Sequence, residues 1–361
     1  MPISSALGSS ALLPAGLGFR NKVINGDMRI AQRGTGAITA SSINQYPVDR
    51  WIATSNATNP ITFQQVADGP AGFTNSVRAT SGGTGSAYSS NHYTFLTHRF
   101  EGFNVADLAW GTASAKSIVL SFWVKVSANA IGTHSLVVEN STGAMTYIAT
   151  YTVTTTNWEY KTIQINGPTS GSFPTDNSTG FQIDFTLGVG SAFEGTAGAW
   201  TSGKYATAGS VDLGSLSSAT WQITGVQLEQ NTQPTPFEQR PIGVELRLCQ
   251  RYYYRYSNAT LNGGGLGYIT GFSATRGFGY IHIPVEMRGS ITMTPASCQF
   301  DSLSLSNVGN ITALATYPTV ANAANTTTLM VDCTLSGGAV AGTLYHFRVA
   351  SGGALQFSAE L

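Results

Sequence analysis

The feature that most constrains the fold is a run in which apolar and polar side chains alternate, residues 117–127 (SIVLSFWVKVS). A period of two is typical of a β-strand that buries one face and exposes the other. The predicted buried face carries Ile118, Leu120, Phe122, Val124 and Val126. Similar shorter runs recur between residues 23 and 238, roughly eight to ten in all, with turn-forming residues between them. No alternation of strands with helices accompanies them, so we expect an antiparallel sandwich of the jelly-roll kind.

The composition agrees with an all-β chain. Its 361 residues include 41 glycines and many serines and threonines, which disfavour helices and suit short strands joined by turns. Apolar residues make up 42%, enough for ordered cores. The length fits two domains, or one large β domain with an appendage.

One stretch departs from the strand pattern, residues 241–257 (PIGVELRLCQRYYYRYS). Pro241 suits the first turn of a helix, and an apolar stripe then recurs at helical spacing. Alternating runs resume at Tyr268. The sequence therefore predicts four parts: an N-terminal arm (1–22), a jelly-roll β-sandwich (23–240), a short connector helix (241–257) and a smaller C-terminal β-sandwich (258–361).

Charged side chains are scarce and balanced. They make up 10% of the chain, and 18 basic residues offset 18 acidic ones. Nucleic acids and anionic membranes require a basic stripe on their partner, so we expect neither. The N-terminal arm lacks the features of an export signal or a membrane span, so we expect no membrane insertion. A surface with little charge suits a subunit that packs against copies of itself.

The chain has three cysteines, Cys249, Cys298 and Cys333, which are widely spaced and form no CxxC pair. Such spacing indicates neither a zinc site nor a disulfide framework. We expect three buried free thiols, consistent with assembly in a reducing cytoplasm.

A long, ordered series of motifs resembles a segment found in structural proteins and tail fibres of tailed bacteriophages. The series comprises VINGDMRIAQRG (23–34), YPVDRW (46–51), VQLEQ (226–230) and TPFEQRPIGVELRLCQRYYYR (235–255). Two later motifs, IPVEMRGSITMTP (283–295) and SAEL (358–361), resemble the β domain that often follows it. The first domain also resembles the jelly roll of carbohydrate-binding modules, with an opening NGD strand and a closing ITGVQLE strand.

The resemblance implies a virion component, commonly trimeric, that is assembled in the host cytoplasm and presents β domains to the host surface. We therefore expect a tail fibre or receptor-binding protein on the outside of the particle. Its arm would bind other virion proteins, and its C-terminal domain would face the receptor, a host surface polysaccharide. Two alternatives stay open: a capsid decoration or head-fibre protein, and a glycan depolymerase.

No motif of catalysis stands out. The five histidines have no metal-ligand spacing, and no glycine-rich segment has a phosphate-binding pattern. The acidic residues lie in separate segments, so no spacing identifies the carboxylate pair that a glycosidase needs. The repeat of the long β-helices on which tailspike depolymerases are usually built is also missing. We expect a binding protein without cofactor chemistry, not an enzyme.

Sugar rings stack on exposed aromatic faces, so we looked for aromatic residues in predicted loops or on outward-facing strand positions. The candidate glycan-binding residues are Trp200, Tyr205, Tyr88, Tyr93, Tyr268, Arg276 and Tyr280. Trp200 and Tyr205 lie in a glycine-rich segment, GAWTSGKYATAGS, where a core role is less expected. The alternative is that these aromatic side chains belong to the core, as such residues more often do.

The likeness to carbohydrate-binding modules implies one possible cofactor, a structural Ca²⁺ between the first and last strands. The candidate ligands are Asp27 on the opening strand and Glu229 or Gln227 on the closing one. The alternative is that Asp27 caps a turn or pairs with Arg29 or Arg50.

The predicted helix supplies candidate contacts for a homotrimer. It is too short to be stable alone and must pack on something. Three copies around an axis would bury its stripe of Ile242, Leu246, Cys249 and Tyr253. On this interpretation the stretch is a structural joint between two β domains.

Overall fold

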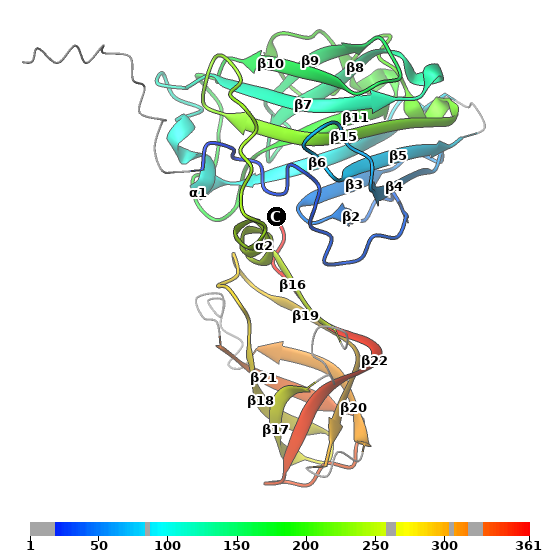
Figure 1. Cartoon of the computed structure of the whole chain (residues 1–361). Coiled ribbons are helices and arrows are strands. Elements are labelled where there is room, and N and C mark those ends of the chain that lie inside the picture. Colours follow the sequence, from blue (N-terminus) through cyan, green and yellow to red (C-terminus); the bar gives the residue numbers. More distant parts are fainter. Residues whose placement is uncertain (1–18, 84–86, 258–264, 303–306, 317–327) are drawn as a thin grey trace, which may run out of the picture.

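A computed structural model of the chain describes residues 19–83, 87–257, 265–302, 307–316 and 328–361. Two β units lie on either side of helix α2 (Ile242–Gln250), and the predicted all-β class is confirmed (Figure 1). Among the described residues, no helix combines the length and the apolar character needed to cross a membrane. Most of the predicted N-terminal arm lies outside the described residues. Its last part packs on the first unit, where Lys22 N donates to Leu228 O (2.8 Å).

The first unit is a sandwich of two antiparallel sheets, which we call the jelly roll. One sheet has the order β1 (Ile38–Thr39), β4 (Ile61–Val66), β5 (Ser76–Gly82), β15 (Ser217–Glu229), β7 (Ile118–Val126) and β10 (Glu159–Ile165). The other has the order β13 (Trp200–Thr201), β9 (Thr146–Val153), β8 (Gly132–Asn140), β11 (Thr179–Val189), β6 (Tyr93–Glu101), β3 (Trp51–Ser55) and β2 (Gln45–Val48).

Short elements connect these strands. They are α1 (Gly102–Val105), the parallel pair β12 (Glu194–Gly195) and β14 (Ala206–Thr207), and the 3₁₀ turns η1 (Ala106–Leu108), η2 (Ala128–Ala130), η3 (Ser191–Phe193) and η4 (Leu213–Ser215).

The core of the jelly roll lies between its two sheets. The five side chains of β7 that the alternation placed inward are at most 2% exposed, as predicted. Phe185 on β11 contacts Trp51 of its own sheet and Trp221 of the opposite sheet, with ring centroids 6.1 and 5.7 Å apart. Burying an aromatic side chain of this kind contributes about 1.5–3 kcal/mol to folding.

The connector helix is shorter than predicted. It ends at Gln250, and residues that the sequence placed in the helix instead form β16 (Tyr253–Ser257), which pairs with β22 (Leu344–Ser358). The run of tyrosines explains the difference, because aromatic residues favour strands. Tyr254 and Tyr256, two residues apart, both pack against the core of the second unit. From Tyr253 onward, the side chains therefore follow the two-residue period of a strand and not the spacing of a helix.

The second unit differs from the predicted C-terminal sandwich because its sheet closes into a barrel. The order is β22, β17 (Gly265–Ser273), β18 (Arg276–His282), β21 (Thr328–Leu335), β20 (Asn307–Thr316) and β19 (Thr292–Asp301), and β19 pairs again with β22. The 15-residue β22 is long enough to pair with β17 and β16 along one edge and with β19 along the other. Phe300, Phe347 and Phe357 fill the barrel interior.

The three cysteines are buried and free, as predicted. Cys249 lies on α2, whereas Cys298 and Cys333 belong to the barrel core. Burial raises the pKa of the Cys298 and Cys333 thiols to about 12, so both stay protonated and unreactive at neutral pH.

Candidate functional site

The motif residues of the phage-like series meet where the jelly roll joins the barrel. The C-terminal residues leave β22 and return to this junction beside α2 (Figure 1). Ala359 N donates to Tyr252 O (2.8 Å), and the Arg288 guanidinium donates to Ala359 O and Glu360 O (2.8 Å each). The SAEL motif therefore serves to attach the end of the barrel to the helix and the jelly roll.

Arg50 is a buried cation at this junction, with only 1% of its surface exposed. Its guanidinium lies 3.6 Å from the centre of the Tyr252 ring, pairs with the Glu360 carboxylate and donates to Arg99 O (2.7 Å). Burial lowers the pKa of Arg50, but the Glu360 carboxylate outweighs this effect and the pKa lies above its ordinary value. Glu360 also accepts from Arg33 (3.2 Å). Arg50 therefore remains charged inside the junction.

The two ends of α2 are fixed to the jelly roll by further ion pairs. At the C-terminal end, Arg251 pairs with Glu101 of β6 (2.6 Å). At the N-terminal end, Glu245 pairs with Arg240 (3.2 Å) and accepts from Asn25 N (2.5 Å). Charged residues of the motif series therefore hold α2 and the C-terminal residues against the jelly roll.

The stripe that we predicted as a trimer contact is divided in two. Cys249 and Tyr253 are 0% and 2% exposed within a single chain, so neither is accessible to a second copy. Cys249 packs against Ile24 and its neighbours in the jelly roll. Ile242 is 52% exposed and Leu246 is partly buried, which leaves these two residues open to an intermolecular contact.

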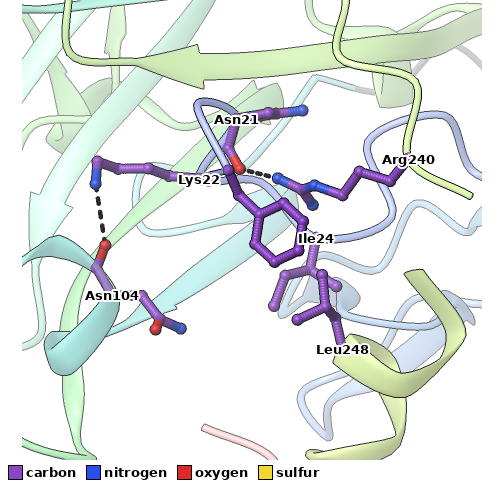
Figure 2. A pocket seen from close by; sticks show the side chains of 7 residues that line it. Asn21, Lys22, Ile24, Asn104, Arg240 and Leu248 are labelled. Carbon is purple, nitrogen blue, oxygen red and sulfur yellow. Dashed lines mark hydrogen bonds between the residues drawn. The ribbon is translucent and has the colours of Figure 1, made fainter. Parts of the chain in front are cut away.

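A pocket of about 210 Å³ lies beside α2 (Figure 2). Its lining residues are Phe19, Asn21, Lys22, Ile24, Asn104, Arg240 and Leu248. Lys22 Nζ donates to Asn104 O (3.1 Å) and Asp107 Oδ1 (2.8 Å), and Arg240 donates to Asn21 O. The side chains of Lys22 and Arg240 thus both have hydrogen-bond partners within the chain. Phe19, Ile24 and Leu248 supply the apolar part of the pocket lining. The pocket has no arrangement suited to catalysis among these seven residues.

Both acidic calcium candidates have side-chain partners within the chain. Asp27 is buried and pairs with Arg29, which is the alternative that the sequence left open. Glu229 accepts from Thr235 N (2.7 Å) and Thr235 Oγ1 (2.8 Å), so it stabilises a turn after the closing strand. Within the described parts of the chain, no group of three or more His, Cys, Asp or Glu side chains is placed to hold an ion.

Tyr93 and Tyr205 come together on the outer face of the seven-stranded sheet. Tyr93 stacks on Phe95 (ring centroids 5.0 Å apart), and Tyr205 contacts both Phe95 (5.4 Å) and Phe193 (5.1 Å). Both tyrosines are partly buried. Much of the ring surface of Tyr93 and Tyr205 is therefore covered by other aromatic side chains of the same chain.

Trp200 and Tyr88 lie apart from that pair. Trp200 donates to Asn166 O (2.9 Å) and packs edge-on against Trp110 (5.7 Å) at the margin of the core. The hydroxyl group of Tyr88 hydrogen-bonds that of Thr94 (2.6 Å), and burial raises the pKa of Tyr88. Both side chains are partly buried, so the jelly-roll candidates offer less free aromatic surface than the sequence suggested.

A carboxylate pair on the same sheet was not identified from the sequence. Gln182 Nε2 donates to Glu139 Oε1 (2.7 Å) and to Asp184 Oδ1 (3.1 Å), so it bridges the two carboxyl groups. Burial, with a contribution from Asp184, raises the pKa of Glu139 to about 9; burial also raises the pKa of Asp184. Glu139 therefore holds a proton at neutral pH.

Only the strand register could have revealed this pair. Glu139 of β8 is aligned with Gln182 of β11, and Asp184 is aligned with Val137. The two acids are thus diagonal neighbours across two strands, 45 positions apart in the chain. Nothing in the local sequence of either strand indicates that alignment.

The three barrel candidates lie together on the outer surface. Tyr268 and Tyr280 are 55% and 60% exposed. Ile269 of β17 pairs with Gly279 of β18, and both face inward, so Tyr268 and Tyr280 project outward side by side. Gly277 and Gly279 occupy inward positions of β18, and Phe278 and Tyr280 lie on its outer side.

Two phenylalanines extend this surface. Phe272, which the sequence did not single out, is 61% exposed, and its ring centroid is 5.7 Å from that of Phe278. Arg276 lies over Phe278 (4.8 Å) and Phe272 (5.6 Å) and forms a two-pronged ion pair with Asp332 (shortest contact 2.6 Å). We call Tyr268, Phe272, Phe278 and Tyr280 the aromatic face.

Comparisons with known proteins give only distant likenesses. No protein-family model and no curated protein matches the chain. A CBM4 module aligns with 57% of this chain and 98% of its own, at 14% identity and a TM-score of 0.33. The enzymatically active domain of bacteriophage CBA120 tailspike protein 4 aligns with 59% of this chain and 22% of its own, at 12% identity and a TM-score of 0.32. TmCBM61 with bound β-1,4-galactotriose aligns with 59% and 100%, at 11% identity and a TM-score of 0.29. Likenesses this weak do not bear on function.

Proposed function

We propose that this protein is a virion component of a tailed bacteriophage, a tail fibre or receptor-binding protein that attaches the particle to host surface glycan without cleaving it. The observation that carries the proposal is the aromatic face of the barrel. Three of its four side chains, Tyr268, Phe272 and Tyr280, have more than half of their surface exposed. Clustered aromatic rings on a surface usually mark a binding site.

The chemistry of the aromatic face suits carbohydrate. The apolar side of a pyranose ring stacks on tyrosine and phenylalanine, while neighbouring polar groups bind its hydroxyls. Thr270 and His282 are exposed on the same outward-facing positions of β17 and β18 and supply such groups. The surface thus combines flat apolar rings with hydrogen-bonding side chains.

In this proposal the jelly roll forms the body of the protein and the barrel faces the host. The N-terminal arm binds other virion proteins. Copies associate as a homotrimer through the open residues of α2, Ile242 and Leu246. Several weak glycan contacts, multiplied by the trimer and by the number of fibres, then give firm attachment.

Binding to host cells tests the recognition step. We expect the full chain to bind, and Tyr280→Ala to reduce binding. Tyr160→Ala is the matched control, because Tyr160 is a 43% exposed tyrosine on β10 of the jelly roll. Equal binding by Tyr280→Ala and Tyr160→Ala would show that the aromatic face does not bind the host surface.

Imaging of labelled particles tests the location. Label at the tail supports a fibre, whereas label spread over the capsid shell would favour the decoration or head-fibre alternative. Release of reducing ends from host glycan by the purified chain would show that the protein is a depolymerase.

A further inference from the structure

We infer that the aromatic face binds an uncharged polysaccharide and not an acidic one. This inference rests on the proposed function and names the class of glycan. It follows from the arginines of the barrel, which are few and have partners within the chain.

The C-terminal part of the chain, residues 258–361, contains no lysine and only three arginines, Arg276, Arg288 and Arg348. Arg348 pairs with the buried carboxylate of Asp301. Arg288 donates to the carbonyl groups of Ala359 and Glu360 at the junction, away from the aromatic face. Neither guanidinium is therefore available to a ligand on β17 and β18.

Arg276 is the cation closest to the aromatic face, and it is occupied by Asp332. Its Nε and Nη2 atoms donate to the two oxygens of that carboxylate (3.0 and 2.6 Å), a geometry that fixes the planar guanidinium. The same group lies over the Phe278 ring (4.8 Å). A carboxylate or phosphate that approached Arg276 would meet the negative charge of Asp332 at the same place. The pair thus gives an acidic polymer no net attraction.

The other groups on this surface are the four rings of the aromatic face, the hydroxyl of Thr270 and the imidazoles of His282 and His346, the latter 5.6 Å from the Tyr268 ring. Tyr268 and Phe272 lie four residues apart on one face of β17, which corresponds to about 13 Å along a strand. That span exceeds a single sugar ring, so the surface fits a polysaccharide segment better than a monosaccharide.

In this arrangement Arg276 is a positioning residue. Its ion pair with Asp332 holds the guanidinium against Phe272 and Phe278 and so fixes the orientation of those rings. Its charge is cancelled by the same pair.

The first test compares neutral and acidic probes on the full chain. Mannan, galactan and β-glucan serve as neutral probes, and hyaluronate, alginate and polygalacturonate as acidic ones. We expect binding to at least one neutral probe, unchanged between low and high salt, because no charge contributes. Tyr280→Ala should weaken it about tenfold, equivalent to about 1.4 kcal/mol, and Tyr160→Ala should leave it unchanged.

The second test removes the carboxylate that pairs with Arg276. Asp332→Asn removes the carboxylate that occupies Arg276, so this variant should keep its neutral-probe binding within about twofold and gain salt-sensitive binding of acidic probes. Asp68→Asn is the matched control, because it cuts the Lys125–Asp68 pair on the jelly roll (3.0 Å) and should gain nothing.

The outcomes separate this inference from the proposed function. Salt-sensitive binding of an acidic probe by the unaltered chain, lost in Tyr280→Ala, would overturn the inference and leave glycan attachment standing. Failure to bind any probe would overturn both. A lower mass of Tyr280→Ala in light scattering, without glycan binding, would also overturn both, because the aromatic face would then be a contact between copies.

Discussion

The guanidinium of Arg251 lies 2.6 Å from the carboxylate of Glu101, across the boundary between α2 and β6. A second nitrogen of Arg251 reaches the same carboxylate (3.0 Å), and the hydroxyl of Tyr252 donates to it (2.7 Å). Glu101 is only 1% exposed. Glu101 is withdrawn from water, and these three donors tie the end of α2 to the jelly roll through it.

We predict that Arg251→Ala lowers the free energy of unfolding by about 3 kcal/mol, since removal of one partner leaves a buried charge uncompensated. Urea denaturation measures this loss. Asp68→Asn is the control: it breaks an exposed pair with Lys125 and should cost at most about 1 kcal/mol. Similar losses in the two variants would show that the Glu101 pair is no stronger than a surface contact.

The stability of the jelly roll should depend on pH through Glu139. Its pKa is raised to about 9 from an ordinary value of 4.5, so the folded state holds a proton that the unfolded state releases. Such a group stabilises the fold fully below about pH 4.5 and loses that contribution as the pH rises to about 9. We expect Glu139→Gln to flatten the decline in unfolding free energy over this range. Parallel pH profiles for the variant and the unaltered chain would contradict the raised pKa of Glu139.

The Asn25–Gly26 turn should not tolerate a side chain at Gly26. A Cβ atom there would lie 2.1 Å from Val226 O of β15, the backbone to which this turn is hydrogen-bonded. We expect Gly26→Ala to cost about 3 kcal/mol, measured as a fall in Tm, because the obstacle is backbone and cannot rotate away. Gly36→Ala is the control, since a Cβ there meets nothing within 4 Å. A Tm for Gly26→Ala equal to that of the control would refute the close approach.

The proposed homotrimer predicts a specific effect of Ile242→Glu. Ile242 is 52% exposed, so the single chain folds without needing it. The variant should have a lower mass in light scattering and an unchanged circular dichroism spectrum. Val340→Glu, at a 61% exposed position of the barrel, should stay assembled. A trimer that survives Ile242→Glu would exclude α2 as the contact.

The parts of the fold that depend on local periodicity were predictable. The alternation in β7 correctly gave its buried face, and the absence of cysteine pairs correctly indicated free thiols. The end of the helix was predicted wrongly because Tyr253 fits both a helical stripe and a strand. Tyr253 belongs to a strand because it pairs with Ser358, which lies more than 100 residues later in the chain. The closure of the barrel escaped prediction for the same reason.

The candidate surface was predictable in part. Tyr268, Arg276 and Tyr280 were named as candidates from the sequence, and all three side chains lie on the outer surface of the barrel. The partner of Arg276 was not foreseeable, since Asp332 reaches it only through the pairing of β18 with β21. Whether two charged side chains on different strands pair depends on how the strands are aligned, and the composition does not reveal that alignment.

β22 pairs with earlier strands along both of its edges. Until this strand has been synthesised, the barrel is an open sheet in which β17 and β19 each present unpaired backbone groups. Such edges accept any matching strand, including the β22 of another copy. Where several copies fold side by side, the same strand that closes one barrel can therefore be exchanged between chains. A domain-swapped assembly would arise by this route without a single change in sequence.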